Sequence, residues 1–188
     1  NFKFVIDESN KLIKKYPYNP FFYNLCGLAL QKINNVQSAI KYFNKAIDLD
    51  KNNIAAINNL ANAYKAMSKL DIAETLYLKA LKINPKYIHA LTNYGNLKQH
   101  IGKFEDSIEL YIKALKINPN QINILFSLAS AYQETGDFKK SKEIANKILT
   151  TEPANASVHK LLSSIINYKD EKDHLVSMEN LIKDKNLK

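Results

Sequence analysis

The sequence contains few of the residues that define many protein classes. Its 188 residues include one cysteine, four glycines, five prolines, no tryptophan and no arginine. A single cysteine, Cys26, excludes an internal disulfide and a cysteine-based metal cluster. The scarcity of glycine and proline favours long helices over many turns. Apolar runs are well short of the roughly 18 residues that span a bilayer, so we expect no membrane-spanning segment.

The positive charge comes from one residue type. All 27 basic residues are lysine, and the formal net charge is +9. Base reading and bidentate phosphate binding favour arginine. We therefore interpret the excess as compositional and expect no specific nucleic-acid partner. No secretory pattern opens the chain, and we expect a cytoplasmic protein.

Prolines recur along the chain with a fixed spacing of 34 residues, and Lys51 takes the one missing place. They are Pro17, Pro85, Pro119 and Pro153. A period of roughly 20–50 residues is typical of a solenoid, in which each repeat stacks on its neighbours. The period predicts one array over residues 1–188. It comprises a half repeat at 1–19, full repeats at 20–53, 54–87, 88–121 and 122–155, a further first helix at 156–167 and a capping helix at about 173–184.

Each full repeat has the pattern of two helices. In the second repeat, Ile57, Leu60 and Tyr64 lie on one face of a first helix, and Leu70 and Tyr77 on one face of a second. Residues that tolerate a left-handed backbone stand between the two helices. These predicted helix stops are Asn34, Ser68, Gly102 and Gly136.

Small and large side chains alternate at fixed positions of the repeat. Position 8 is small, with Gly27, Ala61, Gly95 and Ala129. Position 24 is aromatic in the first three repeats, with Phe43, Tyr77 and Tyr111. Such alternation lets facing helices interdigitate at high density. Two departures, Lys98 at position 11 and Ala145 at position 24, predict looser local packing.

These positions resemble the tetratricopeptide repeat, a 34-residue helix–turn–helix unit, best in the second repeat (IAAINNLANAYKAMSKLDIAETLYLKALKINP). The resemblance extends from about Phe4 to Ile166. It implies an all-α fold, a right-handed superhelix (α-solenoid) of antiparallel helix pairs whose first helices line a concave groove. It also implies a protein–protein interaction scaffold. The sequence shows no nucleophile set, phosphate-binding loop or metal-ligand spacing, so we expect neither an enzyme nor a cofactor.

Polar side chains at groove positions predict a site for an extended peptide or a partner's helix. Position 6 holds Asn59 and Asn93, and position 9, one helical turn on, holds Asn62 and Asn96. A ladder of asparagines suits a peptide backbone because each amide both donates and accepts. The repeat arrays of O-linked N-acetylglucosamine transferases look similar at position 6. The alternative is that these asparagines only solvate the surface.

Other side chains complete the predicted groove. Position 12 carries the polar residues Lys65, Gln99 and Gln133. His89 lies at position 2, and Phe126, at position 5, is either an apolar anchor or a residue packed against the next helix. His89 and His100 are too far apart along one helix to share a metal ion.

The period ends after Pro153. A charged turn, Tyr168–Lys172, precedes an amphipathic segment that we expect to cover the last apolar face with Leu175, Met178, Leu181 and Ile182. This tail also resembles bacterial proteins in which such repeats precede a sulfotransferase domain. The alternative function is therefore a substrate-recruiting accessory domain of a larger sulfotransferase- or glycosyltransferase-like enzyme. End-to-end self-association is a further expectation for an array with an open end.

Overall fold

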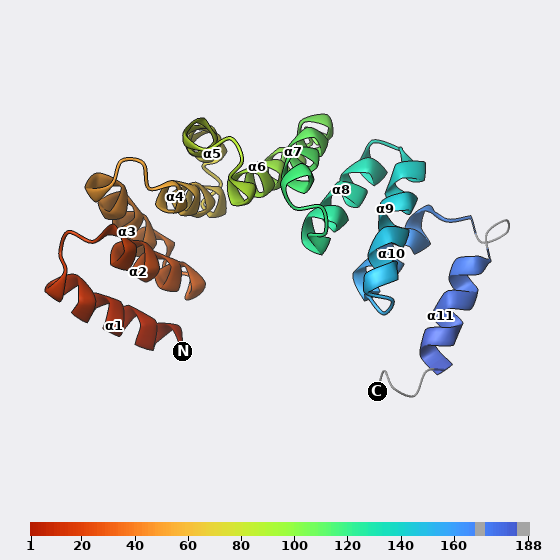
Figure 1. The fold of residues 1–188 in the computed structure, drawn as a ribbon, viewed down its shortest axis with the longest axis horizontal. Coiled ribbons are helices and arrows are strands. Elements are labelled where there is room, and N and C mark those ends of the chain that lie inside the picture. The colour runs from red at the N-terminus through yellow and green to blue at the C-terminus, as the bar shows by residue number, and fades with distance from the viewer. Residues whose placement is uncertain (168–171, 184–188) are drawn as a thin grey trace. The chain divides into compact units, whose positions relative to one another are not determined.

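A computed structural model describes residues 1–167 and 172–183. Within these residues every element of regular secondary structure is an α-helix, which confirms the predicted fold class (Figure 1). The helices are α1 (Phe2–Lys15), α2 (Pro20–Lys32), α3 (Val36–Leu49), α4 (Ile54–Ala66), α5 (Leu70–Ile83), α6 (Ile88–His100), α7 (Phe104–Ile117), α8 (Ile122–Glu134), α9 (Phe138–Thr151), α10 (Ala156–Ile165) and α11 (Asp173–Lys183). The predicted turn lies outside the described residues except for Lys172, as do residue 184 and the side chain of Leu181.

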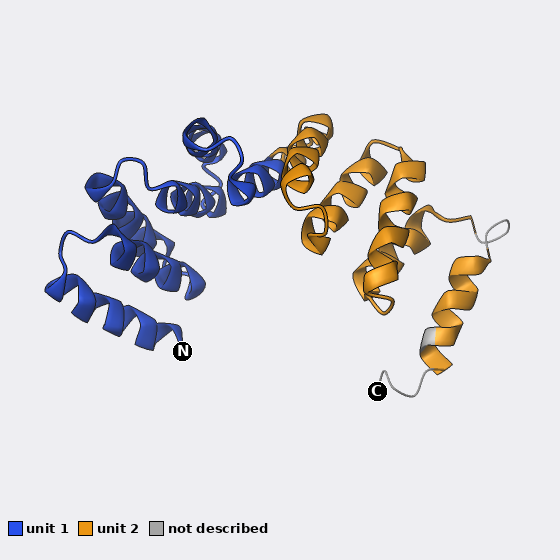
Figure 2. Cartoon of the chain, in the orientation of Figure 1, with its two compact units in different colours: residues 1–97 blue, residues 98–188 orange. Residues whose placement is uncertain are grey.

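The helices form two compact units, residues 1–97 and 98–188, and the boundary falls inside α6 (Figure 2). In each unit consecutive helices pair antiparallel. The even-numbered helices α2 to α10 are the first helices of the repeats, and the odd-numbered α3 to α9 are the second helices. Unit 1 also contains α1, and unit 2 also contains α11.

Local sequence explains where the helices begin and end. The side chains of Asn19, Asn53 and Asn155 each accept a hydrogen bond from a backbone N–H in the first turn, at 3.0, 3.0 and 3.1 Å. The four predicted helix stops have left-handed backbones. Their φ values are 62° at Asn34, 58° at Ser68, 74° at Gly102 and 79° at Gly136. Since Ser68 adopts this conformation without glycine's freedom, its turn is the least favourable of the four.

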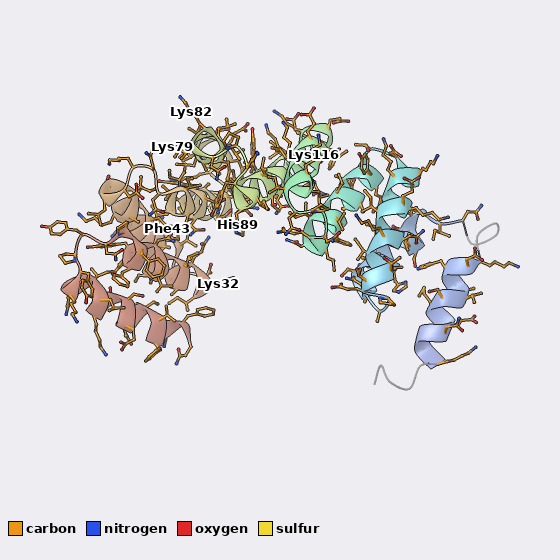
Figure 3. All side chains as sticks on the ribbon, in the orientation of Figure 1. Lys32, Phe43, Lys79, Lys82, His89 and Lys116 are labelled. Carbon is orange, nitrogen blue, oxygen red and sulfur yellow. The ribbon has the colours of Figure 1, made fainter. Side chains whose placement is uncertain are left out.

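The core of unit 1 is built on paired small and large residues. Phe43 and Tyr77 are fully buried, and Phe43 lies inside the α2–α3 pair (Figure 3). A Cβ added to Gly27 would stand 2.5 Å from Cε1 of Phe43, so glycine is required for this close approach. Cys26, beside Gly27, is fully buried as a small core residue.

The core of unit 2 differs at the same positions. Tyr111 is fully buried, but its counterpart in the next repeat is Ala145, which packs with Ile148 and Val158. Lys98, where looser packing was predicted, is only 6% exposed, and its Nζ lies 3.4 Å from Oδ2 of Asp106. The lysine therefore occupies a buried place with its charge compensated.

The C-terminal helices depart from the sequence prediction in two respects. Helix α10 ends at Ile165, two residues before the predicted end. Leu175 and Ile182 of α11 are 45% and 81% exposed, so the prediction that they cover the array is wrong. Among the side chains of α11 that the structure describes, His174 is the buried one.

Candidate peptide-binding face

Asparagine pairs connect the first helices of unit 1. Asn59 Nδ2 on α4 donates to Oδ1 of Asn24 on α2 at 3.0 Å. Asn93 Nδ2 on α6 donates to Oδ1 of Asn58 on α4, also at 3.0 Å. We call these two bonds the amide rungs. Both join position 6 of one repeat to position 5 of the repeat before it.

The two rungs meet on α4. Asn58 Nδ2 lies 3.5 Å from Oδ1 of Asn59, at the long limit of a hydrogen bond. Asn58 is only 4% exposed, whereas Asn59 and Asn93 are half-buried. The structure thus brings together two of the four predicted ladder residues through two partners, Asn24 and Asn58.

Asn62, the third ladder residue, is oriented by an aromatic hydroxyl. The hydroxyl of Tyr77 on α5 donates to Oδ1 of Asn62 at 2.5 Å. Burial raises the pKa of Tyr77 well above its ordinary value, so the hydroxyl retains its proton at physiological pH. With its oxygen held in this way, Asn62 keeps its two N–H groups for other acceptors. Asn96 is half-buried on α6.

Unit 2 connects its first helices through different residues. Gln99 Nε2 donates to Oγ of Ser130 on α8 at 3.2 Å, and Gln133 Nε2 donates to Oγ of Ser164 on α10 at 2.9 Å. The hydroxyl of Tyr111 donates to Oε1 of Gln99 at 2.9 Å. Burial raises the pKa of Tyr111 to about 12. Here position 12 of one repeat binds position 9 of the next.

Lys65, at position 12 on α4, is the cation of the predicted site. It is half-buried, and burial lowers the pKa of its ammonium group. In the part of the chain that the structure describes, no carboxylate forms an ion pair with Lys65. Asn62 lies one helical turn away on the same helix.

The other two predicted residues have ordinary environments. His89 is exposed at the start of α6, and its ring contacts Tyr87 edge-on at 5.4 Å between centroids (Figure 3). Phe126 packs against the apolar cluster of α8, α9 and α10, as the packing alternative predicted.

Sequence reasoning missed the partners of the predicted residues. Asn24 and Asn58 share position 5, which lies 35 residues before the asparagine of the next repeat. That spacing of one repeat plus one residue is visible in the sequence and could have identified both rungs. The pattern at position 24 predicts core residues, and the hydroxyls of Tyr77 and Tyr111 also orient Asn62 and Gln99.

Comparison with known families identifies the repeats. Tetratricopeptide repeat families match residues 20–53, 54–87, 76–109 and 122–155, and a TPR repeat family matches residues 95–136. Together these matches cover residues 20–155. The chain belongs to the tetratricopeptide repeat (TPR) family. A search of curated proteins finds no significant match.

Solved structures of other TPR proteins resemble this chain in fold. PilF of Pseudomonas aeruginosa is 17% identical, with a TM-score of 0.80 over 93% of this chain and 80% of that one. A thermophilic TPR protein of Thermus thermophilus is 16% identical, with a TM-score of 0.74 over 87% and 90%. MamA of Desulfovibrio magneticus RS-1 is 18% identical, with a TM-score of 0.73 over 89% and 94%. At these identities the likeness shows the fold alone.

Metal-ligand clusters and membrane-spanning helices were the other features sought in the structure. Among residues 1–167 and 172–183, no group of three or more His, Cys, Asp or Glu side chains is placed to hold a metal ion. No helix in the same residues is long and apolar enough to cross a membrane.

Proposed function

We propose that this protein-interaction scaffold binds an extended, acidic peptide on the first helices of unit 1. The observation that carries the proposal is the pair of amide rungs linking α2, α4 and α6. TPR proteins are generally scaffolds rather than enzymes, which supports the general role. The amides of the rungs can form hydrogen bonds with a peptide backbone, whatever the side chains of the peptide.

The rungs hold amides in place before a ligand arrives. Each rung uses one of the two N–H groups of Asn59 or Asn93. An amide can make more bonds than this, so each donor asparagine keeps hydrogen-bonding capacity for a peptide carbonyl. A side chain already fixed by its neighbour loses less conformational entropy on binding.

Repeat geometry sets the spacing of the contacts. Packed helices lie about 8–10 Å apart, and an extended chain advances about 3.3–3.6 Å per residue. An asparagine from each repeat would therefore meet roughly every second or third residue of the peptide. The alternation of strand side chains need not match this spacing, because the contacts are to the backbone.

Hydrogen bonds alone give weak binding. Each contributes about 0.5–1.5 kcal/mol net, whereas micromolar affinity needs about 8 kcal/mol. Lys65 offers a stronger contact, because its half-buried ammonium group lacks a carboxylate partner among the described residues. An acidic side chain on the peptide would compensate that charge. The charge of unit 1 supports the same ligand class, since residues 1–97 hold 13 lysines and 6 acidic residues.

The test is peptide binding to the intact chain. A peptide selected from a random library should bind less tightly to the double variant Asn59→Ala, Asn93→Ala, by about five- to 150-fold for two lost hydrogen bonds. Lys65→Met should weaken the binding of acidic peptides. It should leave unchanged the binding of peptides in which Asn or Gln replaces Asp or Glu. Isothermal titration calorimetry measures both effects.

The matched control is Asn44→Ala with Asn52→Ala, two exposed asparagines outside the first helices. This variant should bind like the wild type, and thermal melts must show that all variants fold. Equal affinity of the rung variant and the control would refute the proposal. The accessory-domain alternative has no supporting observation among the described residues and stays a prediction.

A further inference from the structure

Two buried histidines join α10 and α11 in unit 2. His159 and His174 are 8% and 9% exposed. Nδ1 of His159 lies 2.9 Å from Nε2 of His174, and the rings stack with centroids 5.2 Å apart. This histidine pair belongs to unit 2, whereas the amide rungs belong to unit 1, and its role is independent of the proposed function.

Hydrogen bonding fixes where the protons are. Nε2 of His159 lies 2.7 Å from the carbonyl oxygen of Pro153, which can only accept, so Nε2 carries a hydrogen. In a neutral His159, Nδ1 is then an acceptor, and His174 must donate from Nε2. One added proton can be shared by placing it on Nδ1 of His159 while His174 accepts. With two added protons, Nδ1 of His159 and Nε2 of His174 would both carry a hydrogen, and the two N–H groups would repel each other at 2.9 Å.

Positively charged neighbours also disfavour protonation of the docked pair. Lys142 on α9 and Lys172 before α11 line one cavity with His174, together with Asp173. Lys160 on α10 lines a second cavity with His159. Burial, then the neighbouring His159, then Lys142 lower the pKa of His174 below its ordinary 6.5. Asp173, the carboxylate among the described residues that line the cavity of His174, is exposed, so it screens the positive charges only weakly.

Helix α11 has few apolar anchors that could hold it without the histidines. Leu175, Val176 and Ile182 are 45%, 53% and 81% exposed. Met178 is partly buried, beside an apolar cavity of about 500 Å³ that Ala154, Ala156 and Ser163 also line. Burial stabilises docking in proportion to the apolar area removed from water, so these exposed side chains contribute little.

We propose that the histidine pair is a proton-operated latch, which docks α11 on α10 near neutral pH and releases it in mild acid. The two rings bind fewer protons when docked than when free. The contribution of the pair to docking is therefore fully present above pH 6.5. It is lost as the pH falls through the lowered pKa that His174 has in the docked state. Release uncovers the side of α10 that carries His159 and Ser163.

Hydrogen–deuterium exchange of the intact chain tests the latch. Protection factors of the α11 amides, corrected for intrinsic exchange, should be constant from pH 8 to 7. They should then fall by roughly tenfold per pH unit below pH 6.5, since one additional proton is bound on release. Amides of α2 to α8 should keep their protection over the same range, which separates latch release from general acid unfolding.

Two variants make the test specific. His174→Gln keeps a donor near the place of Nε2 and does not titrate, so α11 should stay docked in mild acid. His174→Phe removes the bond and should leave α11 weakly protected at every pH. His89→Gln, which changes an exposed histidine elsewhere, should behave like the wild type. Protection of α11 that does not change with pH, or His174→Gln that keeps the wild-type pH dependence, would overturn the proposal.

Discussion

The two units connect their successive first helices through different side chains. Unit 1 uses asparagine pairs between positions 6 and 5, and unit 2 uses glutamine–serine pairs between positions 12 and 9. Unit 1 carries a formal net charge of +7 and unit 2 of +2, because residues 98–188 hold 14 lysines and 12 acidic residues. Side chains such as Lys79 and Lys82 point away from α5 and belong to the solvated surface (Figure 3). One fold thus presents two chemically distinct surfaces, and only unit 1 combines rungs with a half-buried cation that has no carboxylate partner among the described residues.

The largest expected effect concerns the ring at position 24. Phe43→Ala should lower the free energy of unfolding by about 3–5 kcal/mol, because it empties a fully buried site in unit 1. The corresponding residue in the second repeat of unit 2 is already Ala145, so Ala145→Gly should cost much less. Urea denaturation followed by circular dichroism measures both. Equal losses would show that the two cores do not differ in the way described.

A smaller effect is expected at position 8. Gly27→Ala should destabilise by about 1–3 kcal/mol, because the new Cβ would overlap the Phe43 ring. Combining it with Phe43→Leu should recover part of the loss, since the smaller side chain leaves room for the methyl group. Additive losses in the double variant would argue against a direct clash.

The smallest expected effect concerns the tyrosine hydroxyls of the two units. Tyr77→Phe and Tyr111→Phe should each cost about 0.5–1.5 kcal/mol, through the bonds to Asn62 and Gln99. Burial raises the pKa of both hydroxyls, so their contribution is complete below about pH 10 and is lost as the pH rises further. Denaturation from pH 8 to 11 should show wild-type stability falling towards that of the variants. Unchanged wild-type stability at pH 11 would contradict the assignment.

Much of the fold could be predicted because the same pattern of residues recurs in every repeat. The helix stops at Asn34, Ser68, Gly102 and Gly136 follow from backbone tolerance, and the small–large pairs follow from helix packing. Comparing the same position in every repeat does not identify the partners of the predicted site residues. Each rung joins position 6 of one repeat to position 5 of the repeat before it. Burial of Lys98 depends on Asp106, which lies on the next helix. The histidine pair belongs to the aperiodic tail, where no repeat restricts the structure.

The amide rungs also bear on how such an array can change its length. Each rung joins residues separated by 35 positions, one more than the repeat. If residues 54–87 were lost as a block, Asn93 would stand 35 positions after Asn24, the separation found in each existing rung. Gene-level duplication or deletion of a whole repeat therefore preserves the pairing register. Loss or duplication of residues 54–87 would also keep an asparagine pair at the new junction, because this repeat holds asparagine at both positions, Asn58 and Asn59.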